Sequence, residues 1–585
     1  MNRLTTVRHI REAHPNWHWV SYEEANGHCE GWLIKSKIGQ YDFEILIKIN
    51  DWEFLELPSV YIKKPAFKNF DKLLPLPHLT VTPKIYNEDS FYNLCYAVTS
   101  SLSYDNHDKI SILRWCFNQT VKVLHDIFIN KALCNQEALR EIVPIWSMIS
   151  TKNFINVANW YQANESNELA QRLCLAYKYN DLNIESQNQG LHNFFLKNNN
   201  DRPLQFFVLE PILVDKFPGF PNGFLPNTAP FAIDLKFFLN WLKSFSQKTV
   251  NALIKAIVEF AKCNDHTLFL SCLNINRYTL TFCVEITALK RKVPELKNKL
   301  KTVNISFFND CWVVLTHSTN LTPSFIYKRN IEKLFPENLS NKKVILIGCG
   351  AIGGYLGLSL ARLGAGAEGG ELILIDSDTV ESENIGRHAL GKRYIGYHKA
   401  MSLKFEINEQ LPALNISDFN ESVINAKFYK IFEQADLIID ATATSNVSQR
   451  INEVYFSNKN IQAPIVYTWI MGNGECVQSL FVDKNVKTAC RSCIDKSGYP
   501  IRDQYDALAG LNTIVNFSAC SDYTPYSVSA SQSASVLATD LILDWLRGNV
   551  SPRYRTRYTE RWVGNKIESA DYLPHKDCHV CQNAC

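Results

Sequence analysis

The strongest constraint on the fold of this chain is a glycine-rich turn between two apolar runs in its second half. The segment "VILIGCGAIGG" carries an apolar strand into Gly348, Gly350 and Gly353, and a helix is expected from about Ile352. Glycine permits a tight turn and a close approach of the backbone to a ligand, and the first amides of a helix are available to a phosphate. The pattern therefore predicts an α/β domain with a nucleotide site at the end of this strand.

A second strand and the loop after it add charged side chains to this site. The strand "ELILID" ends in Asp376, where a carboxylate can accept hydrogen bonds from a ribose hydroxyl. The following "DSDTVESENIGRHALGKRYIGYHKA" supplies Asp378, Asn384, Arg387 and Lys399. Two cations beside a glycine turn suit a triphosphate. The alternative is a dehydrogenase-type Rossmann domain with charges on its surface.

These motifs resemble those of the adenylation domain in the ThiF/MoeB and ubiquitin-activating-enzyme family. The resemblance implies that Asp376 holds the ribose of ATP, that Arg387 and Lys399 contact its phosphates, and that Asn384 lies beside them. The glutamine that follows the arginine in the family is His388 in this chain.

Two further positions matter for this resemblance. In "ADLIIDATATSN", Ala443 stands where the family has a magnesium-binding aspartate, so the resemblance moves the metal to Asp440, with an inactive domain as the alternative. In "FIYKRNIEKLF", Arg329 stands where the family carries an arginine that reaches into the ATP site of the partner in a symmetric homodimer. A surface arginine is the alternative there.

Two cysteine pairs predict a metal site. "CRSC" contains Cys490 and Cys493, and "CHVC" contains Cys578 and Cys581. Four thiolates at such spacings can surround a zinc ion in a closed structural site. Two unrelated pairs, or a redox-active dithiol, are the alternatives.

One more cysteine lies between these pairs. Cys520, in "NFSACSDYTPYSVSASQSAS", precedes a Ser/Thr-rich stretch and a helix, in the segment where activating enzymes place their thioester cysteine. A thiol at this position can attack an acyl adenylate and form a transferable thioester. A buried, inert cysteine is the alternative.

The N-terminal region supplies a second candidate thioester cysteine. Short strands from Cys29 to about Pro83 are followed by an irregular stretch and by an amphipathic helix in "KISILRWCFNQTVKVLHDIF". This order resembles a ubiquitin-conjugating enzyme, and Cys95 lies where that family has its cysteine. The His-Pro-Asn motif of the family is missing, and His78 is the nearest candidate for its histidine.

The length of 585 residues allows two to four domains. We predict an α+β ubiquitin-conjugating-like domain at 1–158, an α+β middle domain at 159–322, and a Rossmann-like adenylation domain with a structural zinc site at 323–585. This order resembles the fused activating and conjugating enzymes of bacterial CBASS anti-phage operons.

The resemblance implies an ATP-dependent enzyme that uses magnesium and zinc. It would adenylate the C-terminal carboxylate of a cGAS/DncV-like nucleotidyltransferase, pass the acyl group to Cys520 and then to Cys95, and join it to an amine of a target. Activation of a ubiquitin-like or sulfur-carrier protein is one alternative. A binding scaffold with a degenerate ATP site is another.

Charge and hydropathy exclude several other partners and locations. The formal net charge is only +3 and the basic residues are scattered, so neither nucleic acid nor an anionic membrane is expected as a partner. The first twenty residues lack the apolar run of a secretory signal, which predicts a cytoplasmic protein. The uncharged run at 344–361 contains five glycines and suits a strand, turn and helix better than a membrane span.

Overall fold

The structure is a computed structural model. It describes residues 3–24, 27–67, 70–74, 76–80, 83–97, 104–150, 156–159, 173–175, 206–209, 212–214, 220, 232–263, 268–276, 278–296, 305–308, 310–320, 323–331, 334, 337–412, 414–497, 499, 501, 515–518, 521–563 and 565–582. The described residues of 1–320 form one compact unit, and the described residues from 323 on form a second.

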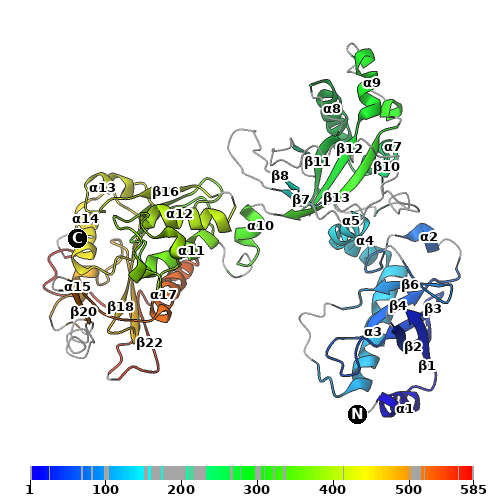
Figure 1. The fold of residues 1–585 in the computed structure, drawn as a ribbon, viewed down its shortest axis with the longest axis horizontal. Coiled ribbons are helices and arrows are strands. Elements are labelled where there is room, and N and C mark those ends of the chain that lie inside the picture. Colours follow the sequence, from blue (N-terminus) through cyan, green and yellow to red (C-terminus); the bar gives the residue numbers. More distant parts are fainter. Residues whose placement is uncertain are drawn as a thin grey trace. The chain divides into compact units, whose positions relative to one another are not determined.

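The first unit begins with a six-stranded antiparallel sheet in the order β1-β2-β3-β4-β6-β5 (Figure 1). Its strands are β1 (His18–Glu24), β2 (Gly27–Ile38), β3 (Tyr41–Lys48), β4 (Ser59–Lys63), β5 (Lys84–Tyr86) and β6 (Asp89–Leu94). Its helices are α1 (Arg3–Ala13), α2 (Phe70–Leu73) and α3 (Lys109–Phe128). Successive residues of β3 face opposite sides, since Ile45 and Ile47 join the core with Leu113 of α3 while Leu46 packs on the other face.

The strands predicted around residues 28–65 are confirmed as β2, β3 and β4, and the predicted amphipathic helix is α3. The side chain of Asp108 caps α3 by accepting a hydrogen bond from the Ser111 amide at 3.1 Å. Two details of the prediction are wrong. The described residues of "HLTVTP" contribute only a bridge from Leu79 to Leu94, and the stretch expected to be irregular contains β6, because its backbone pairs with both β4 and β5.

The first unit continues with a second sheet, of seven strands, in the order β8-β7-β13-β12-β11-β9 with β10 beside β13. Its strands are β7 (Asn156–Asn159), β8 (Leu173–Leu175), β9 (Phe206–Val208), β10 (Ala232–Asp234), β11 (Leu268–Ile275), β12 (Tyr278–Glu285) and β13 (Trp312–Asn320). Its helices are α4 (Lys131–Arg140), α5 (Ile142–Ser150), α7 (Leu235–Lys243), α8 (Gln247–Cys263), α9 (Thr287–Leu296) and the 3-10 turn η5 (Ile305–Phe308).

Helix α5 belongs to the core of this second sheet. Ile142 and Trp146 are buried in that core, and the indole N–H of Trp146 donates to the carbonyl of Thr281 on β12 at 3.1 Å. Helices that follow the N-terminal sheet in sequence thus pack on the middle sheet. The domain boundaries at residues 158 and 322 stay predictions.

The second unit is built around another seven-stranded sheet, in the order β16-β15-β14-β17-β18-β19-β22. Its strands are β14 (Lys343–Ile347), β15 (Glu371–Ile375), β16 (Ile416–Phe419), β17 (Leu437–Asp440), β18 (Ile465–Met471), β19 (Cys476–Val482) and β22 (Tyr554–Tyr558), and a separate hairpin contains β20 (Val515–Ser518) and β21 (Ser521–Tyr523). Its helices are α10 (Pro323–Lys328), α11 (Ala351–Arg362), α12 (Lys399–Gln410), α13 (Lys427–Phe432), α14 (Ser445–Ser457), α15 (Arg491–Ile494), α17 (Val528–Leu546) and the 3-10 turns η6 (Ser382–Asn384) and η7 (Lys392–Tyr394).

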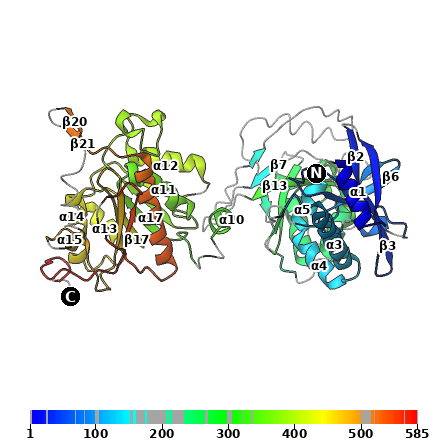
Figure 2. The ribbon, with the colours of Figure 1, turned by 90° about the horizontal axis from the view of Figure 1, so that it is seen from below.

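Helices cover both faces of this sheet (Figure 2). Val344 and Leu346 of β14 pack with α11, α12 and α17, whereas Ile345 and Ile347 pack with α13, α14 and α15. The strands are parallel from β16 to β18, and β19 and β22 are antiparallel. The predicted α/β class is confirmed. Because β14 has β15 on one side and β17 on the other, its carboxyl end is the point where the strand order reverses, which is the usual ligand position in such sheets.

Across the described residues, every helix is too short or too polar to cross a bilayer.

Candidate functional site

The glycine turn after β14 opens into a cavity of about 300 Å³. Gly348 has a positive φ of 85°, and a Cβ atom there would lie 2.8 Å from the Thr442 amide nitrogen. A Cβ on Gly353 would lie 1.8 Å from the carbonyl oxygen of Gly348. Gly350 caps the start of α11, and a Cβ there would meet nothing within 4 Å. The first and third glycines are thus required by the turn itself, and the second faces open space beside the cavity.

Asp376 is fixed at the wall of this cavity by two backbone amides. One carboxylate oxygen accepts the Cys349 N–H at 2.6 Å and the other accepts the Asp378 N–H at 2.8 Å. Burial raises the pKa of Asp376, while these two hydrogen bonds oppose that shift. The remaining lone pairs of an oriented carboxylate can accept hydrogen bonds from a ligand.

His388 supports the same turn from behind. It is buried, its Nδ1 accepts the Leu390 N–H at 3.0 Å, and its Nε2 therefore donates to the Cys349 carbonyl oxygen at 2.8 Å. Burial lowers the pKa of His388 to about 4, so the ring is neutral at physiological pH. In the sequence, His388 stands out only as a variation on a family motif; its contact with the turn could not be predicted because it joins positions 39 residues apart.

The predicted phosphate contacts divide into two groups. Lys399 lines the cavity, and its ammonium group pairs with Asp378 at 2.9 Å. Arg387 is absent from the described lining and lies over the ring of Tyr526 at 4.7 Å, and Tyr526 itself lines the cavity. Asn384 closes η6 by accepting the Glu381 amide at 3.0 Å. The structure thus brings Lys399 to the glycine turn, places Arg387 against a tyrosine of the cavity wall, and shows Asn384 in a local contact.

The carboxylate of Asp440, the predicted magnesium ligand, already accepts hydrogen bonds from other groups of the protein. Only 1% of the residue is exposed, and its oxygens accept hydrogen bonds from the Thr442 amide and hydroxyl at 2.9 and 2.7 Å and from the Ser448 hydroxyl at 2.5 Å. Magnesium requires accessible oxygen ligands and usually keeps several waters. Asp440 does not fit a magnesium ligand in this arrangement, whereas Ala443 lies at the cavity wall.

The four predicted zinc ligands form one buried cluster. The Sγ atoms, which would bind the metal, all lie within 4.8 Å of one another; they belong to Cys490, Cys493, Cys578 and Cys581. Sulfur distances of 3.8 Å (Cys490 to Cys493), 3.7 Å (Cys490 to Cys578) and 3.4 Å (Cys493 to Cys581) are close to the ~3.8 Å expected between thiolates around tetrahedral zinc. The Asn452 amide also donates to the Cys490 sulfur at 3.4 Å, a contact typical of residues around metal ligands. The donor set fits a structural zinc ion.

Cys95 follows β6 and is exposed. Its N–H donates to the carbonyl oxygen of His78 at 2.8 Å, so the histidine singled out from the sequence lies on the adjacent backbone. The ring of His78 lies between two carboxylates, with Nε2 3.4 Å from Glu137 and Nδ1 3.5 Å from Glu141. Desolvation by neighbouring atoms and the negative charge of Glu141 raise the pKa of Cys95. Neither glutamate carried any signal in the sequence.

The remaining predicted catalytic residues are Cys520 and Arg329. Cys520 lies outside the described residues, between β20 and β21 in the sequence. Arg329 is exposed directly after α10.

A comparison with known families matches the ThiF family over residues 325–575. The matched part of the chain, which is similar to this family, is called the ThiF-family domain below. The match covers the glycine turn, the charged cavity and the first cysteine pair, Cys490 and Cys493, and it ends just before Cys578 and Cys581. It agrees with the fold, in which helices cover both faces of a mainly parallel sheet.

Named relatives extend this result. The chain is 30% identical over 263 residues to the ATP-dependent ubiquitin transferase-like protein Cap2 of Pseudomonas aeruginosa, which covers 44% of this chain and 46% of that protein. It is 24% identical over 244 residues to the adenylyltransferase and sulfurtransferase MOCS3 of Arabidopsis thaliana, covering 36% of this chain and 51% of that protein. The chain thus matches less than half the length of its Cap2 relative. These similarities confirm the resemblance to ThiF-type fusion enzymes that the sequence predicts.

Among solved structures, Escherichia coli MccB with ATP matches 42% of this chain and 68% of that chain, with 19% identity and a TM-score of 0.33. A TM-score this low supports no inference about ligands.

Proposed function

We propose that the chain activates the C-terminal carboxylate of a protein by adenylation. A carboxylate oxygen attacks the α-phosphorus of ATP, the bond from that phosphorus to the bridging oxygen breaks, and pyrophosphate leaves with an acyl adenylate as the other product. The observation that carries the proposal is the cavity of the ThiF-family domain, which has the start of α11, Asp376 and Lys399 on its walls.

Each of these groups has a defined task in the proposed reaction. The amides at the start of α11 donate to phosphate oxygens, and open space at Gly350 allows the nucleotide to approach them. Asp376, held by two amides, accepts hydrogen bonds from the ribose. Lys399 neutralises the charge on the phosphates as the bond to pyrophosphate breaks. Its pairing with the largely exposed Asp378 keeps the ammonium group near the cavity until a phosphate replaces that partner.

The metal ions have separate roles in this proposal. Zinc held by the four cysteines stabilises the fold and takes no part in the chemistry, because a closed set of four thiolates leaves no position for a substrate. Magnesium accompanies ATP, but since Asp440 does not fit as its ligand, no step depends on a protein ligand for it.

The acyl group then moves through two thioesters. The Cys520 thiolate attacks the carbonyl carbon of the adenylate and AMP leaves; the Cys95 thiolate attacks that thioester and the Cys520 thiolate leaves. An amine of the target finally displaces the Cys95 thiolate and forms an amide. Exposure of Cys95 supports its role, since an acceptor must reach it.

The proposed substrate is a cGAS/DncV-like nucleotidyltransferase, in a cytoplasmic antiviral reaction of a homodimer in which Arg329 reaches the partner's ATP site. Similarity to the adenylyltransferase and sulfurtransferase MOCS3 favours a second candidate, a ubiquitin-like or sulfur-carrier protein.

Replacement of Lys399 tests the adenylation site. Lys399→Ala should reduce ATP/pyrophosphate exchange at least ~10-fold, the effect of losing about 1.4 kcal/mol of transition-state stabilisation. Lys404→Ala is a matched control on the same helix, because Lys404 pairs with Asp418 and is absent from the described lining of the cavity. Equal exchange in both variants, with melting temperatures unchanged, would contradict the assignment.

The order of the thioesters is tested by trapping them. Cys520→Ala should retain exchange and form no adduct on position 520 or on Cys95, because the transfer to Cys95 starts from the Cys520 thioester. Cys95→Ala should retain exchange and a reducible adduct at Cys520 while conjugation to an amine stops. Mass spectrometry after non-reducing digestion locates the adducts, and an adduct on Cys95 in the Cys520→Ala protein would reverse or disprove the order.

A further inference from the structure

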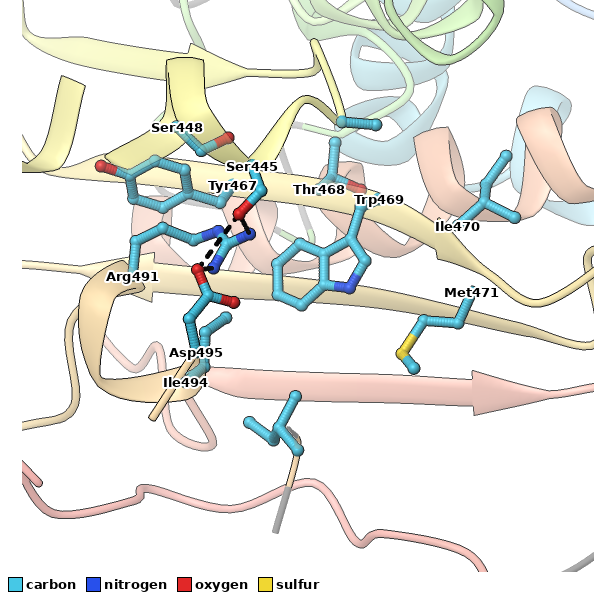
Figure 3. Close-up of a pocket in the computed structure, with 12 residues that line it drawn as sticks. Ser445, Ser448, Tyr467, Thr468, Trp469, Ile470, Met471, Arg491, Ile494 and Asp495 are labelled. Atoms are coloured by element: carbon cyan, nitrogen blue, oxygen red, sulfur yellow. Dashed lines mark hydrogen bonds and ion pairs between the residues drawn. The ribbon is translucent and has the colours of Figure 1, made fainter. Parts of the chain in front are cut away.

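A second cavity of about 210 Å³ lies beside the nucleotide cavity in the ThiF-family domain. Both cavities have Ala443 in their walls, so they adjoin at this residue. The second one, here called the Arg491 cavity, is lined by Ser445, Trp469, Met471, Arg491, Asp495 and neighbouring apolar and hydroxyl-bearing residues (Figure 3). Its volume is far above the ~10–15 Å³ needed by a single water, so it can admit a larger group.

The guanidinium of Arg491 is the central polar group of this cavity. Arg491 is only 8% exposed and lies over the ring of Trp469 at 5.3 Å. Its Nη1 donates to Oδ2 of Asp495 at 2.6 Å, whereas the hydrogen bond that its Nη2 makes within the described residues is the longer one to the Ser445 hydroxyl, at 3.5 Å (Figure 3). One side of the guanidinium is therefore well satisfied, and the other retains a donor for a better acceptor.

The two carboxylate oxygens of Asp495 also differ in their hydrogen bonding. Its Oδ2 accepts Arg491, and also the Gln449 amide at 2.8 Å and the Ser445 hydroxyl at 3.3 Å. Every hydrogen bond found for Asp495 in the described part of the chain ends on Oδ2. The pair thus presents a donor on Arg491 and an acceptor on Asp495.

Charge balance selects the kind of group that can bind here. Arg491 and Asp495 neutralise each other, and the rest of the described wall carries no charge: it consists of hydroxyl groups, such as that of Ser448, and of apolar side chains, such as that of Met471. A buried acidic or basic side chain would have no opposite charge of its own, which is costly in such surroundings. A neutral amide offers one acceptor and one donor and matches the pair without adding charge.

The cysteine cluster fixes this arrangement in place. Arg491 lies between Cys490 and Cys493 in the sequence. Its backbone N–H donates to the side-chain oxygen of Asn452 at 3.3 Å, and the side-chain amide of Asn452 donates to the Cys490 sulfur. The metal site therefore also orients a side chain at the wall of a cavity.

We propose that the Arg491 cavity binds a neutral amide group from the protein segment that precedes the activated carboxylate. The amide belongs either to the backbone of that segment or to an Asn or Gln side chain. The inference rests on the proposed function, because it places the remainder of the substrate next to the nucleotide cavity. It makes Arg491 and Asp495 determinants of substrate specificity.

Peptide-dependent ATP/pyrophosphate exchange tests this with the full chain. The probes are decapeptides with a free carboxylate that end in three variable residues and glycine, in which each variable position is Ala, Gln, Glu or Lys in turn. A second set has single N-methylated peptide bonds. We expect one position at which Gln lowers KM ~10-fold relative to Glu or Lys, or one bond whose methylation raises KM by that factor, the effect of one well-made hydrogen bond in a buried site.

Asp495→Asn provides a change of specificity that cannot arise from unfolding. This variant leaves the Arg491 charge unmatched, so a side-chain site should now favour Glu over Gln, and a backbone site should gain affinity for peptides with Glu beside the sensitive bond. Arg491→Lys should raise the peptide KM ~10-fold and leave the KM for ATP unchanged, because a single ammonium cannot reproduce the planar guanidinium. Arg450→Lys, on the exposed pair with Glu453, is the matched control.

Zinc content and melting temperature are measured for each variant. With both intact, a wild-type preference for charged side chains, or an unchanged preference in Asp495→Asn, would overturn the inference alone. Failure of every peptide and of intact candidate proteins to support exchange in the wild type would overturn the proposed function and this inference with it.

Discussion

The glycine turn after β14 and the thiol after β6 both lie at the end of a strand, but their surroundings are assembled in different ways. At the turn, close approaches between backbone atoms set the geometry, as shown by the 1.8 Å that a Cβ on Gly353 would leave to the Gly348 oxygen, and the side chains of Asp376 and His388 add hydrogen bonds to this backbone. At Cys95, the described residues provide one backbone hydrogen bond, from the Cys95 N–H to the His78 carbonyl, and side chains from a separate helical region complete the surroundings.

This difference explains why one site has a sequence motif and the other does not. A close backbone approach admits only glycine, so it leaves a pattern over a few adjacent positions. A site built from Cys95, His78, Glu137 and Glu141 depends on side chains that many sequences can supply, at spacings set by the fold. The comparison predicts that substitutions have large effects on structure in the ThiF-family domain and small ones around Cys95.

The largest effect is expected when a thiol of the four-cysteine cluster is removed. Cys578→Ser should lose the zinc and lower the melting temperature by roughly 5 °C or more, because a structural metal contributes folding free energy directly. Cys95→Ser is the matched control in the other region, and it should change neither quantity because Cys95 is exposed. Metal analysis and thermal unfolding measure both. Absence of zinc from the wild-type protein would disprove the metal assignment, and equal destabilisation by the two variants would contradict the comparison.

An intermediate effect is expected at the glycine turn. Gly353→Ala should lower the free energy of unfolding by about 1–3 kcal/mol, since the new methyl group must displace backbone atoms. In Gly350→Ala the new methyl group meets nothing within 4 Å, so this variant should stay within about 1 kcal/mol of the wild type. Denaturant titration distinguishes them. If the two alanine variants were equally stable, the steric account of the turn would be wrong.

The smallest effect is expected on the reactivity of Cys95. The charge of Glu141 raises the pKa of this thiol and so reduces its thiolate fraction at a given pH. Glu141→Gln should therefore modestly increase the rate at which iodoacetamide alkylates Cys95 near pH 8. The difference should vanish at pH values where Cys95 is fully deprotonated in both the variant and the wild type. Peptide mapping separates Cys95 from the other cysteines, and Glu137→Gln serves as the control on the other side of His78. Superimposable pH profiles for Glu141→Gln and the wild type would exclude this charge as a cause.

The sequence predicted best those features whose partners are close in the chain or whose chemistry is unmistakable. The sequence alone indicates the glycine turn, Asp376 beside it and the four cysteines. Strand and helix periodicity marks the turn and Asp376, and paired spacing marks the cysteines. Strand β6 was missed, since its pairing with β4 and β5 depends on segments further away. The same reason applies to His388 and Arg491, whose buried contacts join segments that only the fold brings together. Arg387 was found by its motif, but its stacking on Tyr526 was not.

The cysteine cluster has one topological consequence. It ties together two points of the chain that are 88 residues apart in sequence, from Cys490 to Cys578 and from Cys493 to Cys581. The intervening stretch, which includes Cys520, is thus a closed ring when the metal is bound. A single backbone cut within this ring would leave the two fragments joined through the metal, and a chelator would release that link.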